Sequence, residues 1–528
     1  MKELSRLSRA DEKIQEIASE FGLDCFPQEF DVVPAQKMLE IMAYRLPVNY
    51  SHWSFGRDYE MERTRYEHGW GVPYEVVLNS NPCRAYLMNT NPFAVQVLVM
   101  AHVYGHNDFM KNSLHFQPSR RDMIPSASEA AARMRRYEER YGEAAVERLM
   151  DAALAVEHNI DPDFFIREEA PEEKSARQAA AVNPPRGRGP YEDLLGQHGA
   201  GMRPETERRT PLEPERDLIL YIMDNSPKPL AEWEKDILSV VRQQSRYFMP
   251  QRRTKVMNEG WATYWHQRIM ERLFQDGYLS AEEHGYYNLY NARILTHHPR
   301  TINPYLVGLR LFEDIEERWD KGRFGRDWEE CRSEASRQSW DKGLGRGREK
   351  IFEVRRTHTD RFFFEEFLTE RLVHDLKLYL YRAVPRRDNI DYVIAEDDWQ
   401  VVRRLLVRLY SDFGIPHIVV EDGDYRGRRE LYLKHCFEGL PLDREYREKT
   451  LEHVHYLWQR PVHLESHEYE GDASEQPVVM SLAGQERRLW RKLYTFDGVN
   501  HLEKYLPSER RRPQGAPTAP SSTALRRI

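Results

Sequence analysis

The stretch "MNEGWATYWH", residues 257–266, places polar side chains among large aromatic ones. Seven residues make about two turns of an α-helix, so Glu259 and His266 would share one helix face. Thr263 lies between them on that face. A carboxylate and an imidazole on an aromatic-rich helix indicate a buried polar face. Such a face either only packs against its neighbours or also binds a ligand.

A second helix offers matching side chains. In "PFAVQVLVMAHVYGHNDFM", residues 92–110, His102 and His106 are four residues apart in an apolar run. This spacing projects two imidazoles from one helix face, as in the HExxH zinc motif. Val103 stands where that motif carries its glutamate. Imidazoles in an apolar run need partners, so the alternatives are a metal ion and a hydrogen-bonded core.

Two further segments carry candidate residues. "YGEAAVERLMDAALAVEHNID", residues 141–161, places Glu147 and Asp151 on one face of a rather apolar helix. Such carboxylates either form a solvated face or help to complete a metal site and orient its histidines. "VNYSHWSFGRDYEMERTRYEHG", residues 48–69, is dense in aromatic side chains, and His52 within it would either line a pocket or take part in aromatic packing.

Composition excludes several classes of protein. The net charge of −8 argues against a protein built mainly to bind nucleic acid. No run approaches 18 consecutive apolar residues, so no membrane span is predicted. The polar N-terminus lacks the apolar core of a signal peptide. The four cysteines form no CxxC pair, which favours the reducing cytoplasm and no thiolate zinc site.

The pattern along the chain predicts a mainly α fold with a smaller α+β C-terminal domain. Residues 1–350 are predicted to form a mainly helical domain, interrupted at 168–215 by a mobile insertion rich in Pro, Gly and charge. Residues 351–506 mix helices and strands, including a hairpin within 416–437. Residues 507–528 are predicted to be a disordered basic tail.

Five motifs together resemble the SpoVR family, the stage V sporulation protein R-like proteins. They are "YSHWSFGRDYE", "AHVYGHNDFMKN", "TKVMNEGWATYWHQRIM", "INPYLVGLRLFEDIEERWD" and "FLTERLVHDLKLYLY". The resemblance runs in order from about residue 10 to 500. It implies a cytoplasmic protein with a role in spore cortex peptidoglycan or in stationary-phase and stress physiology. Family genes often neighbour a PrkA-like serine protein kinase gene, which implies a kinase-linked complex as a partner.

A narrower resemblance concerns the site alone. "NEGWATY" is similar to the helix of glutamate-zincin peptidases whose glutamate is the third zinc ligand, so a gluzincin-like pair of site helices is predicted. The resemblance implies a divalent metal, preferably zinc, on His102, His106 and Glu259. The fourth ligand or orienting partner would be His266, Glu147 or Asp151. The predicted pocket-lining residues are His52, Glu75, Asp108, Asn258 and Tyr264.

Three hypotheses follow for the function. The first is a metal-dependent hydrolase that lacks the HExxH glutamate and takes its general base from Glu75, Glu147 or Asp108. The second is a non-catalytic, metal-stabilised scaffold in a kinase-linked stress complex. The third is a metal-free polar core. The sequence does not name a substrate or an oligomeric state.

Overall fold

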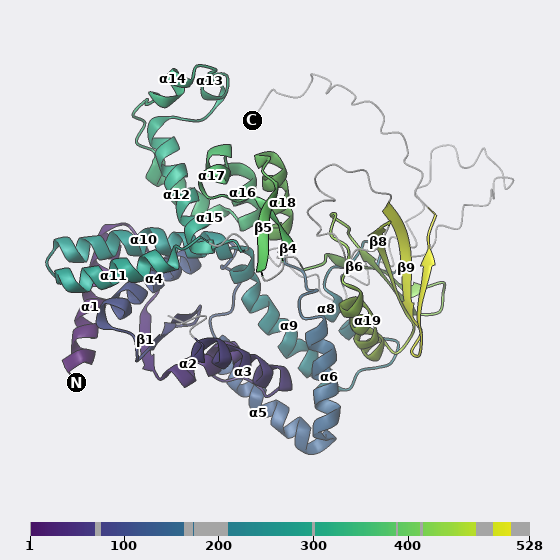
Figure 1. The fold of residues 1–528 in the computed structure, drawn as a ribbon. Helices are drawn as coiled ribbons and strands as arrows, with labels where there is room; N and C mark the ends of the chain where they lie inside the picture. The colour runs from purple at the N-terminus through teal and green to yellow at the C-terminus, as the bar shows by residue number, and fades with distance from the viewer. Residues whose placement is uncertain are drawn as a thin grey trace, which may run out of the picture.

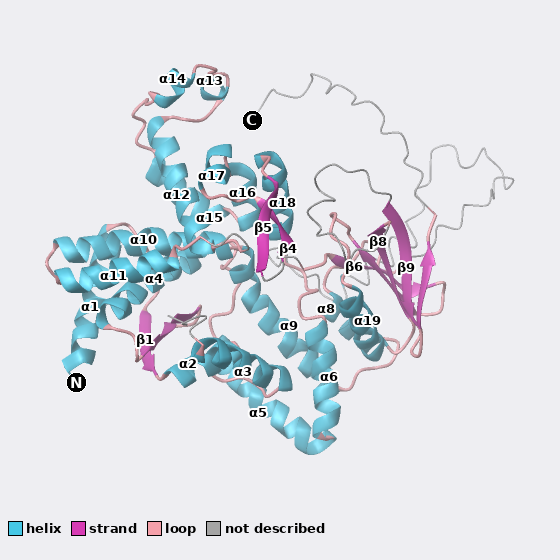
Figure 2. Cartoon of the chain, in the orientation of Figure 1, coloured by secondary structure: helices cyan, strands magenta, loops and turns pink. Residues whose placement is uncertain are grey.

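The structure is a computed structural model that describes residues 2–68, 75–162, 173, 210–297, 301–386, 389–411, 415–470 and 489–507. Helices predominate, and the main sheet lies in the C-terminal part (Figures 1 and 2). The predicted mainly α fold with a smaller α+β C-terminal part is therefore confirmed. Most of the predicted insertion, 168–215, and the tail after 507 fall outside the described residues.

The N-terminal part alternates helices with a small three-stranded sheet. Its elements are α1 (Lys2–Glu20), β1 (Gln28–Val33), α2 (Ala35–Tyr44), α3 (Trp53–Glu67), β2 (Glu75–Leu78), β3 (Cys83–Met88), α4 (Phe93–Asn112), α5 (Met123–Tyr141), α6 (Glu143–Ala155), α8 (Leu218–Asn225), α9 (Glu232–Arg253), α10 (Lys255–Gln275), α11 (Ala281–Ile294) and α12 (Pro304–Lys321). The sheet has the order β1-β3-β2, so β2 is an edge strand.

The remaining elements begin with two short helices that extend beyond the end of α12 (Figure 1). They are α13 (Arg326–Glu329), α14 (Glu334–Gln338), α15 (Gly347–Thr357), α16 (Asp360–Phe367), α17 (Glu370–Asp375), β4 (Leu380–Arg386), β5 (Asn389–Glu396), α18 (Trp399–Ser411), β6 (Ile418–Tyr425), β7 (Glu430–His435), α19 (Arg444–Trp458), β8 (Val462–Tyr469), β9 (Leu489–Phe496) and β10 (His501–Tyr505). The pair β6–β7 is antiparallel, as the predicted hairpin requires.

Local sequence explains where the site helices begin and end. Pro92 precedes α4. Proline suits a helix start because it has no N–H group, and the first N–H groups of a helix have no partner within it. The side chain of Asn303 accepts hydrogen bonds from the first amides of α12, and Gly322 ends that helix in the left-handed conformation. Ser280 and Glu283 form a capping box at the start of α11.

A first hydrophobic core surrounds α4, α10 and α12, with α1, α15 and α16 packed around them. Its largest fully buried side chains are Phe109, Trp261, Tyr264, Phe312, Phe363, Phe364 and Phe367. Glycines allow the backbones to approach closely. A Cβ on Gly260 would lie 2.3 Å from a backbone atom of Gly308, and one on Gly105 would lie 2.5 Å from the Cα of Ala262. These contacts fix α10 between α4 and α12.

A second hydrophobic core joins α6, α8 and α9 to the five-stranded sheet, whose order is β10-β9-β8-β7-β6. Helix α19 connects the parallel strands β7 and β8 and lies against the sheet (Figure 2). Residue Glu215 pairs with Val420 of β6 through both backbone hydrogen bonds. Helices α15–α18 belong to the first core, although they follow residue 346. None of the described helices combines the length and apolarity needed to cross a bilayer.

Candidate metal centre

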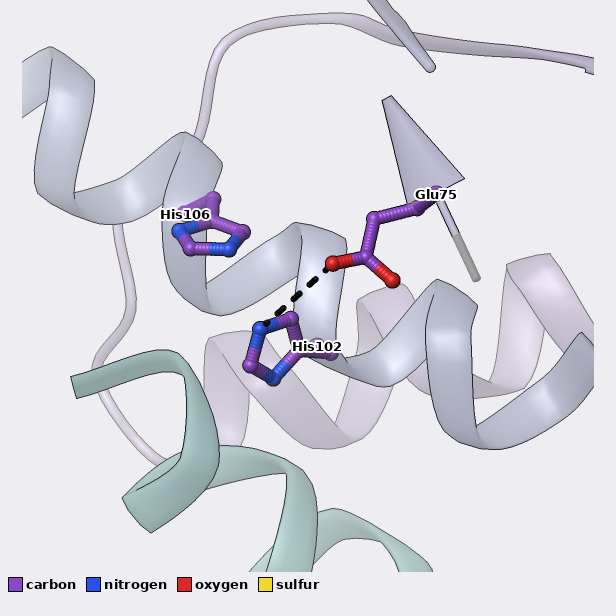
Figure 3. A group of neighbouring side chains, drawn as sticks. All are labelled: Glu75, His102 and His106. Atoms are coloured by element: carbon purple, nitrogen blue, oxygen red, sulfur yellow. Dashed lines mark ion pairs between the residues drawn. The ribbon is translucent and has the colours of Figure 1, made fainter. Parts of the chain in front are cut away.

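Three elements bring four polar side chains together inside the first core. His102 and His106 lie one turn apart on α4, Glu259 lies in the first turns of α10, and Glu75 extends from the edge strand β2 toward the imidazoles (Figure 3). Both histidines are about 4% exposed. The Gly105–Ala262 contact places α10 directly against the helix face that carries the histidines, so Glu259 reaches both rings.

Both glutamates lie close to the imidazole nitrogens. Oε2 of Glu259 lies 3.4 Å from Nε2 of His102 and 3.4 Å from Nε2 of His106. Zinc bonds to nitrogen and oxygen of about 2.1 Å, in a tetrahedron, put neighbouring ligand atoms about 3.4 Å apart. Oε1 of Glu75 lies 3.9 Å from Nε2 of His102. Ligand atoms of Glu75, His102 and His106 all lie within 4.8 Å of one another.

Nδ1 of each imidazole forms a hydrogen bond on the side of the ring away from Glu259. Nδ1 of His106 lies 2.9 Å from Oδ1 of Asn258, an atom that can only accept a hydrogen bond. His106 therefore donates through Nδ1, so its Nε2 faces Glu259: it shares a proton with that carboxylate when no cation is bound, and it offers a lone pair when the ring is neutral. A metal ligand needs this tautomer.

A relay of hydrogen bonds fixes His102 in the same way. Nε2 of His266 lies 3.0 Å from Oδ1 of Asn291 and donates to it, so Nδ1 of His266 is an acceptor. Nδ1 of His102 lies 2.9 Å from that nitrogen and donates to it. The Nε2 atom of His102 thus also faces Glu259. His266 contacts His102 on the side away from Glu259, so of its two predicted roles the structure favours the orienting partner.

The electrostatics of the cluster follow from two carboxylates and two imidazoles buried together. Although burial opposes ionisation, hydrogen bonds from His102 and His106 hold the pKa of Glu259 well below its usual range. Burial acts against a charged imidazole, yet Glu259 raises the pKa of His106. Burial, with the Glu259 charge, raises the pKa of Glu75. Without a cation, protons must therefore occupy the space between these groups, and a metal would displace them.

His266 behaves differently because it is buried behind the cluster. Burial and the neighbouring His102 lower the pKa of His266 to about 3. It is therefore neutral near pH 7, as its place as an acceptor in the relay requires.

Two of the predicted pocket-lining residues lie elsewhere in the same core. Asp108 accepts hydrogen bonds from the backbone of Asp24 and from the indole of Trp261, and its carboxylate lies 3.6 Å from Arg355. It ties α4 to α10 and α15. Burial raises the pKa of Asp108 to about 6. Tyr264 donates to Glu316 of α12 at 2.5 Å. The structure does not bring either side chain to the histidine cluster.

His52, which caps the start of α3, and Asp151 of α6 form a separate group in the second core. Nε2 of His52 lies 3.1 Å from Oδ1 of Asp151, and the indole of Trp53 donates to the same oxygen at 2.7 Å. Glu147 lies half-buried one turn earlier on α6. Asp151 therefore pairs with His52 and Trp53, and in the part of the chain that the structure describes no hydrogen bond or ion pair joins this group to His102. Of the three candidate general bases, Glu75, Glu147 and Asp108, only Glu75 contacts a proposed metal ligand among the described residues.

Sequence reasoning missed three residues at or around the site. Asn291 on α11 accepts from His266, and the ring of Tyr305, at the start of α12, lies 5.7 Å from that of His102. Asp360 on α16 accepts hydrogen bonds from the amides of Val256 and Met257 and so caps the start of α10. The motif "INPYL" around Tyr305 was a usable signal, whereas an isolated asparagine or aspartate carries none.

Fold and site together define a class: a mainly helical protein whose central helix pair presents a His/His/Glu cluster beside an edge-strand glutamate. Comparison with known proteins adds the family. The profile described as SpoVR like protein matches residues 1–415, and that of the SpoVR-like C-terminal domain matches residues 416–469. The chain belongs to the SpoVR family.

One curated relative matches most of the chain. The chain is 31% identical over 500 residues to a protein of Escherichia coli (strain K12) that is described as "Uncharacterized protein YcgB". The alignment covers 87% of this chain and 91% of the relative. No solved structure matches the chain. The activity must therefore be argued from the site.

Proposed function

We propose that this protein is a metal-dependent hydrolase whose divalent metal, preferably zinc, is bound by His102, His106 and Glu259. One observation carries the proposal: Oε2 of Glu259 lies 3.4 Å from Nε2 of each histidine, a separation that suits ligands of one metal ion, and both Nδ1 atoms are already hydrogen-bonded elsewhere. Imidazole and carboxylate ligands suit Zn²⁺, Fe²⁺ or Mn²⁺. Without a cation, protons would have to lie between the Glu259 carboxylate and the two imidazole nitrogens.

The metal, when bound, supplies Lewis-acid polarisation of the substrate and activation of water. The chain must then supply a base, because Val103 is buried and apolar where HExxH has its glutamate. We assign this role to Glu75 because it approaches the histidines from β2 and because burial raises its pKa, which is the direction that favours proton uptake by a general base. The general base would thus come from a strand, whereas the glutamate of HExxH lies on the helix that carries the two histidines.

A second candidate function rests on the same glutamate. If Glu75 is a fourth ligand, four protein atoms close the coordination shell and the site is structural. The protein would then be a non-catalytic scaffold, in keeping with a partner role in a kinase-linked stress complex. In either case the role that the family resemblance suggests is in spore cortex peptidoglycan or in stationary-phase and stress physiology.

Metal content tests the site itself. Untagged protein purified without chelator is expected to carry about one transition metal per chain, and His102→Ala, His106→Ala and Glu259→Ala are expected to carry far less. His374→Ala, an exposed histidine on α17, is the matched control and should keep the metal. His266→Leu should weaken binding by about 10- to 100-fold, because it loses only the orienting bond. Well under one metal per wild-type chain, with a melting temperature that added zinc, iron or manganese leaves unchanged, refutes the proposal.

A cobalt-substituted protein separates the open site from the closed one. In an open site, Glu75→Gln keeps cobalt, and acetohydroxamate changes the visible absorption of both wild type and variant. In a closed site, Glu75→Gln loses cobalt affinity and acetohydroxamate leaves the wild-type spectrum unchanged. The first result supports the hydrolase, and the second supports the scaffold.

A further inference from the structure

A basic hollow lies beside α16 and α18, two helices of the first core, and shares no lining residue with the candidate metal centre. It is lined by side chains of α16, of α18 and of the segment after β7, and it encloses about 420 Å³. We refer to it as the arginine cleft, and its charged lining residues are Arg361, Glu365, Arg403, Arg404, Arg408 and Glu438. Four arginines against two glutamates leave a net charge of +2 in a protein whose overall charge is −8.

The arginines of α18 lack the partners that surface arginines of this chain usually have. Arg310, Arg326 and Arg346 each pair with a glutamate three or four residues further along the chain. Among the described residues, Arg404 and Arg408 form no ion pair or hydrogen bond, and Arg403 only stacks on the ring of Trp399.

The arrangement also differs from an ordinary solvated helix face. Arg404 and Arg408 are four residues apart, so they project from one side of α18. Arg361 reaches the same hollow from α16, the helix packed against α18, where its nearest carboxylate is Glu365 at 3.9 Å. Guanidinium groups from two helices therefore converge on one concave space, where Glu365 and Glu438 balance only half of their charge.

We propose that the arginine cleft binds a phosphate monoester. A phosphate monoester carries close to two negative charges at neutral pH and so balances the excess charge of the lining. Its oxygens match the fork of N–H donors on each guanidinium. The hollow has room for part of the molecule that carries the phosphate. This proposal is independent of the metal centre and stands or falls separately from the proposed hydrolase.

Calorimetric titration of the full-length protein tests the cleft. The probes are inorganic phosphate, O-phosphoserine, a phosphoserine hexapeptide and AMP, at ionic strength held constant with KCl. At least one probe is expected to bind, and the tightest one identifies what carries the phosphate. The double variant Arg404→Gln/Arg408→Gln should weaken that probe at least tenfold, and Arg404→Lys should weaken it less, because lysine keeps the charge but loses the fork.

The matched control is Arg326→Gln/Arg346→Gln, which removes two paired surface arginines with the same change in net charge. It should change the affinity less than twofold, and circular dichroism should show all variants folded. Three results would overturn the proposal: no binding of any probe at about 10 mM, equal weakening by the control pair, or unaltered binding in the double variant.

Discussion

At the scale of single residues, burial gives each histidine a different role. His102 and His106 are surrounded by carboxylates, whereas His435 on β7 is 5% exposed and its Nδ1 lies 2.8 Å from Oγ of Ser466 on β8. Burial, together with neighbouring histidines, lowers the pKa of His435 to about 4. Its neutral ring helps to join the two parallel strands.

This lowered pKa predicts how stability depends on pH. The unfolded chain has a histidine pKa of about 6.5, so between pH 6.5 and 4 the unfolded state binds a proton that the folded state does not. The stabilisation is therefore complete above pH 6.5 and is lost as the pH falls through this window. Titration of His435 across this window lowers the free energy of unfolding by up to about 3 kcal/mol.

His435→Asn tests this assignment by urea unfolding at pH 7 and pH 4.5. The variant is expected to be destabilised at pH 7, and its deficit relative to wild type should shrink by about 2 kcal/mol at pH 4.5. His158, whose pKa is also lowered to about 4, titrates in both proteins and cancels in the difference. A deficit that stays the same at both pH values would show that His435 does not titrate in this way.

At the scale of elements, the contacts between helices decide whether the site forms. Helix α10 is fixed between α4 and α12 by two close approaches that tolerate no added side chain. Glu259 directly precedes Gly260, so its position depends on the distance between α10 and α12. Overpacked cores respond by backbone shifts that cost about 1–3 kcal/mol or more.

Gly260→Ala should therefore lower stability by about 3 kcal/mol and weaken metal binding, because a Cβ there would lie 2.3 Å from the backbone of Gly308. Gly285→Ala is the matched control: Gly285 is an exposed residue of α11 with no atom within 4 Å of its added Cβ. Alanine there should be neutral or stabilise by about 0.5–1 kcal/mol. Melting curves and metal titrations give both readouts, and a Gly260→Ala protein as stable as wild type contradicts the packing argument.

At the scale of the whole molecule, distant parts of the chain share each core. The second core joins Tyr221 and Ile222 of α8 to Val420 of β6, Leu433 of β7 and Trp458 of α19. Tyr221 stacks on Trp458 with ring centroids 5.9 Å apart. The C-terminal sheet is thus one wall of a core whose other wall is helical.

A chain that ends at residue 415 should consequently expose this apolar wall. It is expected to melt at a lower temperature than the full chain and to bind a hydrophobic dye such as ANS, although it retains all residues of the proposed metal centre. The full-length protein serves as the reference in both measurements. An unchanged melting temperature in the shortened chain would mean that the helical part is stable without the C-terminal sheet, contrary to the shared core.

The sequence predicted the parts of the fold and site that depend on short-range periodicity. The fold class and the hairpin within 416–437 follow from residue spacing along single elements. The same spacing predicted that His102 and His106 project from one face of α4 and that Glu259 and His266 lie two turns apart on α10. The mobile insertion, the division at residue 350 and the ligand set itself remain predictions. Asn258 was found because it adjoins Glu259 in the same motif.

Only the tertiary structure decided which faces meet. His102 and His266 are 164 residues apart, and glycine contacts between helices bring them together. The same packing places Glu75 beside the histidines, directs Asp108 toward Arg355, and pairs Asp151 with His52 in the second core. A helical pattern states which residues share a face, but the partner of that face depends on the complementary shape of remote backbones, and no local spacing encodes that shape.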